Sequence, residues 1–135
     1  MPQLRVLVVE DDNVQRMTLC SWLAGISGLS VTGGAASGSE ALAELEKARP
    51  DLVLTDVEMP GIDGFDLTRH IRKMVNAPRV VIMSASDEPS YNELAQLAGA
   101  ETFIHKPGLY ERLAHFLRIE FGLDAKPLTR GTPAT

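Results

Sequence analysis

The chain has 135 residues, of which 44% are hydrophobic and 23% are charged, and its formal net charge at pH 7 is −5. This length and composition are typical of one globular domain that encloses its own core. The negative charge argues against direct binding of nucleic acid by this chain, because surfaces that hold a phosphate backbone are basic.

The sequence shows no sign of secretion or of a membrane segment. Cys20 is the single cysteine, so an internal disulfide is excluded. No apolar run approaches the roughly 20 residues of a membrane span. The first apolar run is too short for a signal peptide and is followed at once by acids. We therefore expect a cytoplasmic protein with no membrane partner.

Short apolar runs alternate along the chain with segments of helical periodicity. Apolar runs without polar alternation predict strands that are covered on both faces. The predicted strands are Leu4–Val9, Leu29–Thr32, Leu52–Thr55, Arg79–Met83 and Thr102–Ile104. The predicted helices are Val14–Ala24, Glu40–Ala48, Phe65–Val75, Glu88–Ala98 and Leu109–Phe121. Repeated strand–helix units with right-handed crossovers predict an α/β domain with a parallel sheet and helices on both faces.

The end of the chain differs in composition from the rest. Residues 122–135 are rich in Pro, Thr and Gly and offer no core of their own. We expect a domain over residues 1–121, followed by a flexible tail or the start of a linker over 122–135.

Polar side chains stand where the predicted strands end. Glu10–Asp12 follow the first strand, Asp56 the third, Ser84 the fourth and Lys106 the fifth. Each has an ordinary structural explanation when taken alone: an acid after a strand can cap the next helix, and Asp56 can be a solvated loop residue. In a parallel sheet, however, all these ends lie at the edge where open α/β sheets bind ligands.

The grouped residue types point to phosphoryl chemistry. Neighbouring carboxylates repel one another, so one of them must protonate or a cation must bind. A donor set of oxygens without His or Cys suits Mg²⁺. Asp56 beside Mg²⁺, with the Lys106 ammonium and the Ser84 hydroxyl, predicts an aspartyl-phosphate acceptor.

Several motifs together resemble the receiver domain of two-component response regulators. The resemblance covers about residues 4–121, and its pieces are specific as an ordered set although each is weak alone. They are Val8-Val9-Glu10-Asp11-Asp12, Pro50-Asp51-Leu52-Val53-Leu54-Thr55-Asp56, Met59-Pro60-Gly61, Asp63-Gly64, Ser84-Ala85 and Lys106-Pro107.

The resemblance implies a flavodoxin-like (βα)5 fold with strand order 2-1-3-4-5, the order that receiver proteins exemplify. It implies that Asp56 takes a phosphoryl group from a sensor histidine kinase or a phosphotransfer protein. Ser84 would donate a hydrogen bond to the phosphoryl group and Lys106 would pair with it. The implied Mg²⁺ ligands are Asp11, Asp56, the backbone carbonyl of Glu58 and, through water, Glu10.

The resemblance also implies a switch. Phe103 would turn inward as Ser84 moves toward the phosphate, although a plain core Phe on the fifth strand is a serious competing interpretation. The face formed by helix 88–98, strand 102–104 and helix 109–121 would signal to an output domain or protein, and a homodimer through this face is a further expectation. The residues expected there are Tyr91, Leu94, Phe103, His105 and Tyr110.

Two positions depart from the family pattern or add to it. Gly108 stands where the family usually has a bulky apolar residue, which predicts a looser entry to the last helix. Glu58 places an acid two residues after Asp56, where the family's side chain affects the lifetime of the phosphoryl group.

Two other functions compete with a phosphorylated switch in bacterial signalling. One is a phosphate-independent pseudo-receiver that acts only as an interaction module. The other is a phosphatase of the haloacid dehalogenase type, which would place its nucleophile after the first strand instead of at Asp56. We expect no enzymatic activity beyond self-phosphorylation and autodephosphorylation on Asp56.

Overall fold

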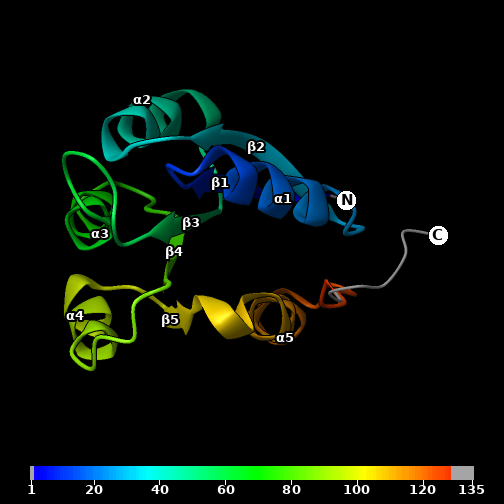
Figure 1. Cartoon of the computed structure of the whole chain (residues 1–135). Helices are drawn as coiled ribbons and strands as arrows, with labels where there is room; N and C mark the ends of the chain where they lie inside the picture. The colour runs from blue at the N-terminus through cyan, green and yellow to red at the C-terminus, as the bar shows by residue number, and fades with distance from the viewer. Residues whose placement is uncertain (1, 129–135) are drawn as a thin grey trace.

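The computed structural model describes residues 2–128, which form a parallel sheet in the order β2-β1-β3-β4-β5 (Figure 1). This topology confirms the predicted flavodoxin-like fold. The strands are β1 (Leu4–Val9), β2 (Leu29–Ala35), β3 (Leu52–Asp56), β4 (Arg79–Ser84) and β5 (Thr102–His105). The helices are α1 (Asn13–Ala24), α2 (Gly38–Ala48), α3 (Gly64–Arg72), α4 (Tyr91–Ala98) and α5 (Leu109–Phe121), and the short 3-10 helix η1 (Lys106–Gly108) precedes α5.

The helices cover both faces of the sheet. Helices α1 and α5 lie on one face, and α2, α3 and α4 lie on the other (Figure 1). Side chains alternate between the two cores, so that Val8 and Leu54 pack toward α1 and α5 while Leu7 and Val53 pack toward α2 and α3. All of β3 is buried, as expected for the central strand of a parallel sheet. This burial fixes the position of Asp56 at the end of β3.

Three element boundaries differ from the sequence-based prediction by three residues each. Strand β2 continues through Gly33 and Gly34, which we expected to end it. A Cβ at Gly34 would lie 3.0 Å from the Arg16 side chain, so the glycine leaves room for Arg16 beside the strand. Helix α3 ends at Arg72 rather than near residue 75, and α4 begins at Tyr91 rather than near residue 88.

Close backbone packing holds the loop that follows Asp56. Gly64 begins α3, and its N–H donates a 2.9 Å hydrogen bond to the carbonyl of Val57. A Cβ on Gly64 would lie 2.2 Å from the carbonyl oxygen of Asp56, which is far inside van der Waals contact. The glycine therefore allows the start of α3 to press against the end of β3.

Gly64→Ala is expected to destabilise the protein by roughly 1–3 kcal/mol, because the strain of overpacking exceeds the gain in helix propensity. Gly108→Ala is the matched control: a Cβ there meets no atom closer than 3.7 Å, so the change should stay within about 0.5 kcal/mol. Urea unfolding of both variants measures the difference. Equal free energies of unfolding would mean that the loop before α3 has room to shift.

The segment after α5 packs on the domain as far as the structure describes it. Ala125 is fully buried in the core beside α1 and α5, and the Arg118 guanidinium donates a 2.6 Å hydrogen bond to its carbonyl. The indole N–H of Trp22 donates a 2.9 Å bond to the carbonyl of Lys126. Residues 129–135, the rest of the predicted tail, lie outside the described residues, and the domain boundary at 121 stays a prediction.

Among residues 2–128, we find no helix with both the length and the apolar character needed to cross a membrane.

Candidate functional site

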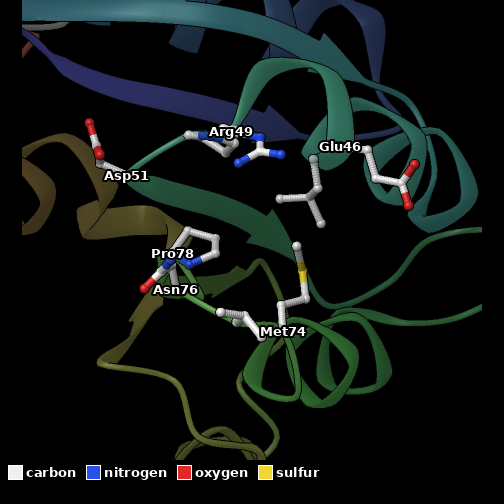
Figure 2. Close-up of a pocket in the computed structure, with 9 residues that line it drawn as sticks. Glu46, Arg49, Asp51, Met74, Asn76 and Pro78 are labelled. Atoms are coloured by element: carbon white, nitrogen blue, oxygen red, sulfur yellow. The ribbon is translucent and has the colours of Figure 1, made fainter.

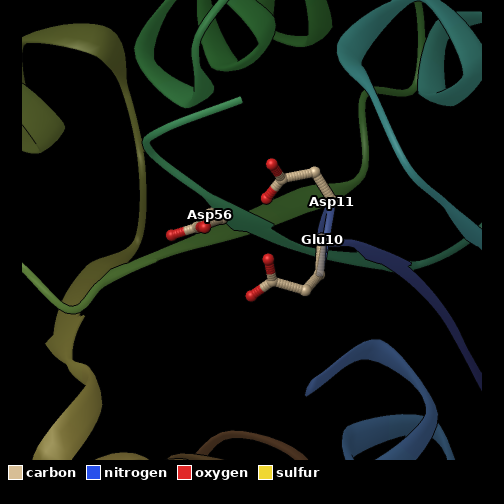
Figure 3. A group of neighbouring side chains, drawn as sticks. All are labelled: Glu10, Asp11 and Asp56. Carbon is tan, nitrogen blue, oxygen red and sulfur yellow. The ribbon is translucent and has the colours of Figure 1, made fainter. Parts of the chain in front are cut away.

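Three carboxylates meet at the C-terminal edge of the sheet. Glu10 and Asp11 follow β1, and Asp56 ends β3, the neighbouring strand. An oxygen atom from each lies within 4.8 Å of the others (Figure 3). Glu10 and Asp56 are buried, with exposed fractions of 2% and 5%, whereas Asp11 is exposed. The structure thus brings together acids that are 45 residues apart in the sequence (56 − 11).

Lys106 reaches the same cluster from the end of β5. Its Nζ lies 2.5 Å from Glu10 Oε1 and 3.4 Å from Asp56 Oδ2. It also donates a 2.7 Å hydrogen bond to Oε1 of Gln15, in the first turn of α1. The ammonium is therefore held mainly by Glu10 and Gln15 and stands within reach of Asp56.

Ser84, the last residue of β4, also lies at this edge of the sheet. Its side chain is fully buried, and its hydroxyl donates a 2.8 Å hydrogen bond to Oε1 of Glu58. The backbone N–H of Ser86 donates to the Ser84 oxygen at 3.0 Å. Asp56 Oδ1 accepts a 3.0 Å bond from the N–H of Val57, which fixes the orientation of that carboxylate.

The electrostatics of the cluster show a deficit of positive charge. Burial raises the pKa of Asp56 to about 7; Lys106 opposes this rise, and Glu10 and Glu58 add to it. Burial alone would lower the pKa of Lys106, but the hydrogen bond to Glu10 and the charge of Asp56 raise it above its ordinary value. The single positive charge of Lys106 therefore does not balance the negative charges of Glu10, Asp56 and Glu58.

This donor set fits a hard divalent cation. The oxygens of Glu10, Asp11 and Asp56 converge without any His or Cys, which is the chemistry that Mg²⁺ prefers. Burial is the main cause of the raised pKa of Asp56, and the charges of Glu10 and Glu58 add to it, so a bound cation would favour the ionised carboxylate. The acidic cluster therefore fits the magnesium site that the sequence predicts.

The aromatic residues of the predicted output face separate into two groups. Phe103 is half-buried and packs edge-to-face on Tyr91, with ring centroids 6.2 Å apart. Tyr110 lies on the other side of the sheet, where its ring packs against Trp22 of α1 at 5.1 Å. The imidazole Nε2 of His105 lies 3.1 Å from the carbonyl oxygen of Ala85. The structure therefore places Tyr110 with α1 and away from the Tyr91–Phe103 pair.

Sequence reasoning missed two residues that contact the site. Gln15 accepts a hydrogen bond from Lys106, and Tyr91, which we expected only on the output face, lies near enough to Glu58 for that carboxylate to raise the pKa of Tyr91. A Gln in the first turn of a helix and a Tyr at the start of another carry no motif. Their reach into the site depends on how α1 and α4 lie on the sheet, which the sequence pattern does not give.

A cavity of about 780 Å³ lies at the opposite edge of the sheet (Figure 2). It is bounded by the ends of α2 and α3 and by the residues that lead into β3 and β4, including Arg49, Asp51, Met74 and Pro78. It shares no residue with the acidic cluster, so size alone does not identify the functional site here.

The chain is similar in sequence to known proteins. The family model described as the response regulator receiver domain matches residues 6–118. Response regulator GacA of Pseudomonas viridiflava is 35% identical over 118 residues, which are 87% of this chain and 55% of that protein. A protein-glutamate methylesterase/protein-glutamine glutaminase of Myxococcus xanthus is 39% identical over 105 residues, which are 77% of this chain and 30% of that protein.

Solved structures show the same fold. The signal receiver domain of the putative response regulator NarL from Mycobacterium tuberculosis matches with a TM-score of 0.74 and 32% identity, over 78% of this chain and 86% of that one. A LuxR-family two-component response regulator from Aurantimonas matches with a TM-score of 0.81 and 26% identity, over 89% and 86%. The chain spans about half of GacA and less than a third of the methylesterase, so these relatives contain further sequence that this chain does not match.

Proposed function

The chain belongs to the family of response regulator receiver domains, and on that premise we propose that Asp56 accepts a phosphoryl group from the phosphohistidine of a sensor kinase or phosphotransfer protein. The observation that supports this most is the Asp56 carboxylate itself. It is buried at a strand end, has a pKa of about 7, and stands 3.4 Å from the Lys106 ammonium in a group of further acids.

The proposed reaction is a transfer between two nucleophiles. A carboxylate oxygen of Asp56 forms the new P–O bond while the P–N bond to the donor imidazole breaks, and the imidazole leaves with the electron pair. Lys106 pairs with the phosphoryl oxygens, and Ser84 donates its hydroxyl proton to one of them. Loss of the group by attack of water on phosphorus restores the carboxylate and releases inorganic phosphate.

Magnesium is the proposed cofactor. Asp11, Asp56 and the backbone carbonyl of Glu58 would hold it, with Glu10 acting through water. When bound, Mg²⁺ offsets negative charge on the carboxylates and on the transferring phosphoryl oxygens. The chain's own residues hold and orient the acceptor, and Lys106 supplies the second positive charge.

The proposed consequence is a change at the α4–β5–α5 face, with Phe103 as the switch aromatic, that signals to an output domain or protein. Dimerisation through this face and a cytoplasmic location belong to the same proposal. The chain matches only 30% of the length of the Myxococcus xanthus methylesterase, which supports placing any such activity outside a chain of this kind. We propose no activity here beyond gain and loss of the phosphoryl group.

A small phosphodonor separates this function from its competitors. With acetyl phosphate and Mg²⁺, the protein should gain one phosphoryl group by intact mass, labile to hydroxylamine as acyl phosphates are. A pseudo-receiver would gain none. A phosphatase would consume many donor molecules per protein in the same time.

Asp11→Asn tests the metal site. Removing one of the convergent carboxylates should weaken Mg²⁺ binding by roughly tenfold or more, as measured by calorimetric titration. Phosphorylation should then need correspondingly more Mg²⁺ and should stop in chelator for both proteins. Asp124→Asn, which removes an exposed acid in the segment after α5, is the matched control and should bind as the unchanged protein does. Equal affinity in Asp11→Asn would place the cation elsewhere.

A further inference from the structure

In the unphosphorylated protein the hydroxyl of Ser84 already donates its hydrogen bond to another acceptor. A serine hydroxyl has one proton to donate, and Ser84 donates it to Glu58 Oε1 at 2.8 Å. The Ser84 oxygen in turn accepts the N–H of Ser86 at 3.0 Å. A phosphoryl oxygen on Asp56 can therefore receive the Ser84 proton only if the bond to Glu58 is given up.

Glu58 links this hydroxyl to α4. Tyr91 interacts with the same carboxylate, since the Glu58 side chain is the main cause of the raised pKa of Tyr91, with burial adding to it. Tyr91 is the first residue of α4, and its ring packs edge-to-face between Phe65 at 5.3 Å and Phe103 at 6.2 Å. One carboxylate thus joins the hydroxyl at the end of β4 to the first turn of α4.

The negative charge near Glu58 should make its interaction with Ser84 sensitive to phosphorylation of Asp56. Glu58 and Asp56 already interact unfavourably, since the charge of Glu58 contributes to the raised pKa of Asp56. A phosphoryl group adds a charge of about −1.5 to −2 at neutral pH. Glu58 is exposed to solvent on its outer side, so its carboxylate can move away from the added charge without being buried elsewhere.

We propose that the Glu58 side chain is a positioning residue that holds Ser84 and Tyr91 in the unphosphorylated protein and yields Ser84 to the phosphoryl group. Its movement then carries Tyr91 and the first turn of α4, which makes a second connection to that helix beside the one through Phe103. The inference rests on the proposed function, because it concerns what the phosphoryl group displaces. Glu58 here competes with the phosphoryl group for one hydrogen bond and is not itself a catalytic residue.

Beryllium trifluoride with saturating Mg²⁺ is the probe, since it mimics the phosphoryl group on a carboxylate without hydrolysis. Glu58→Ala removes the competing acceptor and the charge, and should lower the probe midpoint by about tenfold, corresponding to one hydrogen bond to a charged group. Glu58→Gln keeps an acceptor for Ser84 without the charge, so its probe midpoint should lie between those of Glu58→Ala and the unchanged protein. Glu88→Gln, which removes an exposed acid near Tyr91, is the control and should stay within about twofold of the unchanged protein.

Tyr91→Phe tests the connection to α4 separately. It removes only the hydroxyl, so the protein should bind the probe with nearly unchanged affinity. Amide NMR shifts in residues 91–94 on probe binding should fall to less than half of their normal size, while the shift at Ala85 is kept.

Two results would overturn the inference: a Glu58→Ala midpoint within twofold of the unchanged protein, or full α4 shifts in Tyr91→Phe. A thermal melt of each variant confirms that it is folded. If the unchanged protein binds no probe and takes no phosphoryl group, it is the proposed function that fails, so the two failures are distinguishable.

Discussion

Asp56→Asn is expected to leave a folded protein that gains no phosphoryl group from acetyl phosphate and Mg²⁺. Asparagine has the shape of aspartate, so the buried end of β3 should keep its packing. Its amide oxygen carries no formal charge, however, and attack on phosphorus would not yield an acyl phosphate. Lys106 would also lose a charged partner at 3.4 Å. Intact mass spectrometry after incubation with the donor measures the result directly.

Asp66→Asn is the matched control for this experiment. Asp66 is a partly exposed acid on α3 that pairs with Arg69, so its replacement should leave phosphorylation unchanged. A phosphoryl group on Asp56→Asn would identify another acceptor, and Glu10 and Asp11 would be the first positions to examine. Loss of the group in both variants would instead point to a general effect of removing acidic charge.

The fold follows from patterns that the sequence shows plainly. Apolar runs such as Leu52–Thr55 lack polar alternation because both faces of β3 are covered, and this identifies a parallel sheet. The end of β2 was predicted wrongly because Gly33 and Gly34 weaken a strand in general. In this chain Gly34 lies against the side chain of Arg16 from α1, a contact between distant segments that local propensity does not contain.

Part of the site also follows from the sequence pattern, and part does not. Parallel topology alone predicts that Asp11, Asp56 and Lys106 approach one another, because each follows a strand of one sheet. The partners that hold these groups in the structure were not predicted. Gln15 reaches Lys106 only because the first turn of α1 passes over the strand ends, and the Trp22 indole binds a backbone carbonyl far along the chain. Such contacts depend on how helices lie on the sheet.

The charge of Asp56 should make the metal-free protein less stable as the pH rises. The pKa of Asp56 is about 7 in the folded protein against an ordinary value of 3.8, so the folded state favours the neutral carboxyl. Below about pH 4 the group is neutral in both states and carries no penalty. From about pH 4 to pH 7 the unfolded chain ionises readily while the folded one resists, and the lost stability approaches the order of 4 kcal/mol at 1.36 kcal/mol per pH unit.

Asp56→Asn tests this loss, because the variant lacks the Asp56 carboxyl while every other titrating group stays in the chain. Urea unfolding in chelator at pH 4.5 should give the two proteins similar free energies of unfolding, and at pH 8 the variant should be more stable by a few kcal/mol. Saturating Mg²⁺ at pH 8 should reduce the difference between the two free energies of unfolding. The cation stabilises the ionised Asp56 carboxylate, which only the unchanged protein has. Parallel stability curves across this pH range would show that Lys106 already compensates the buried charge of Asp56, and the argument for a cation at this cluster would lose its electrostatic basis.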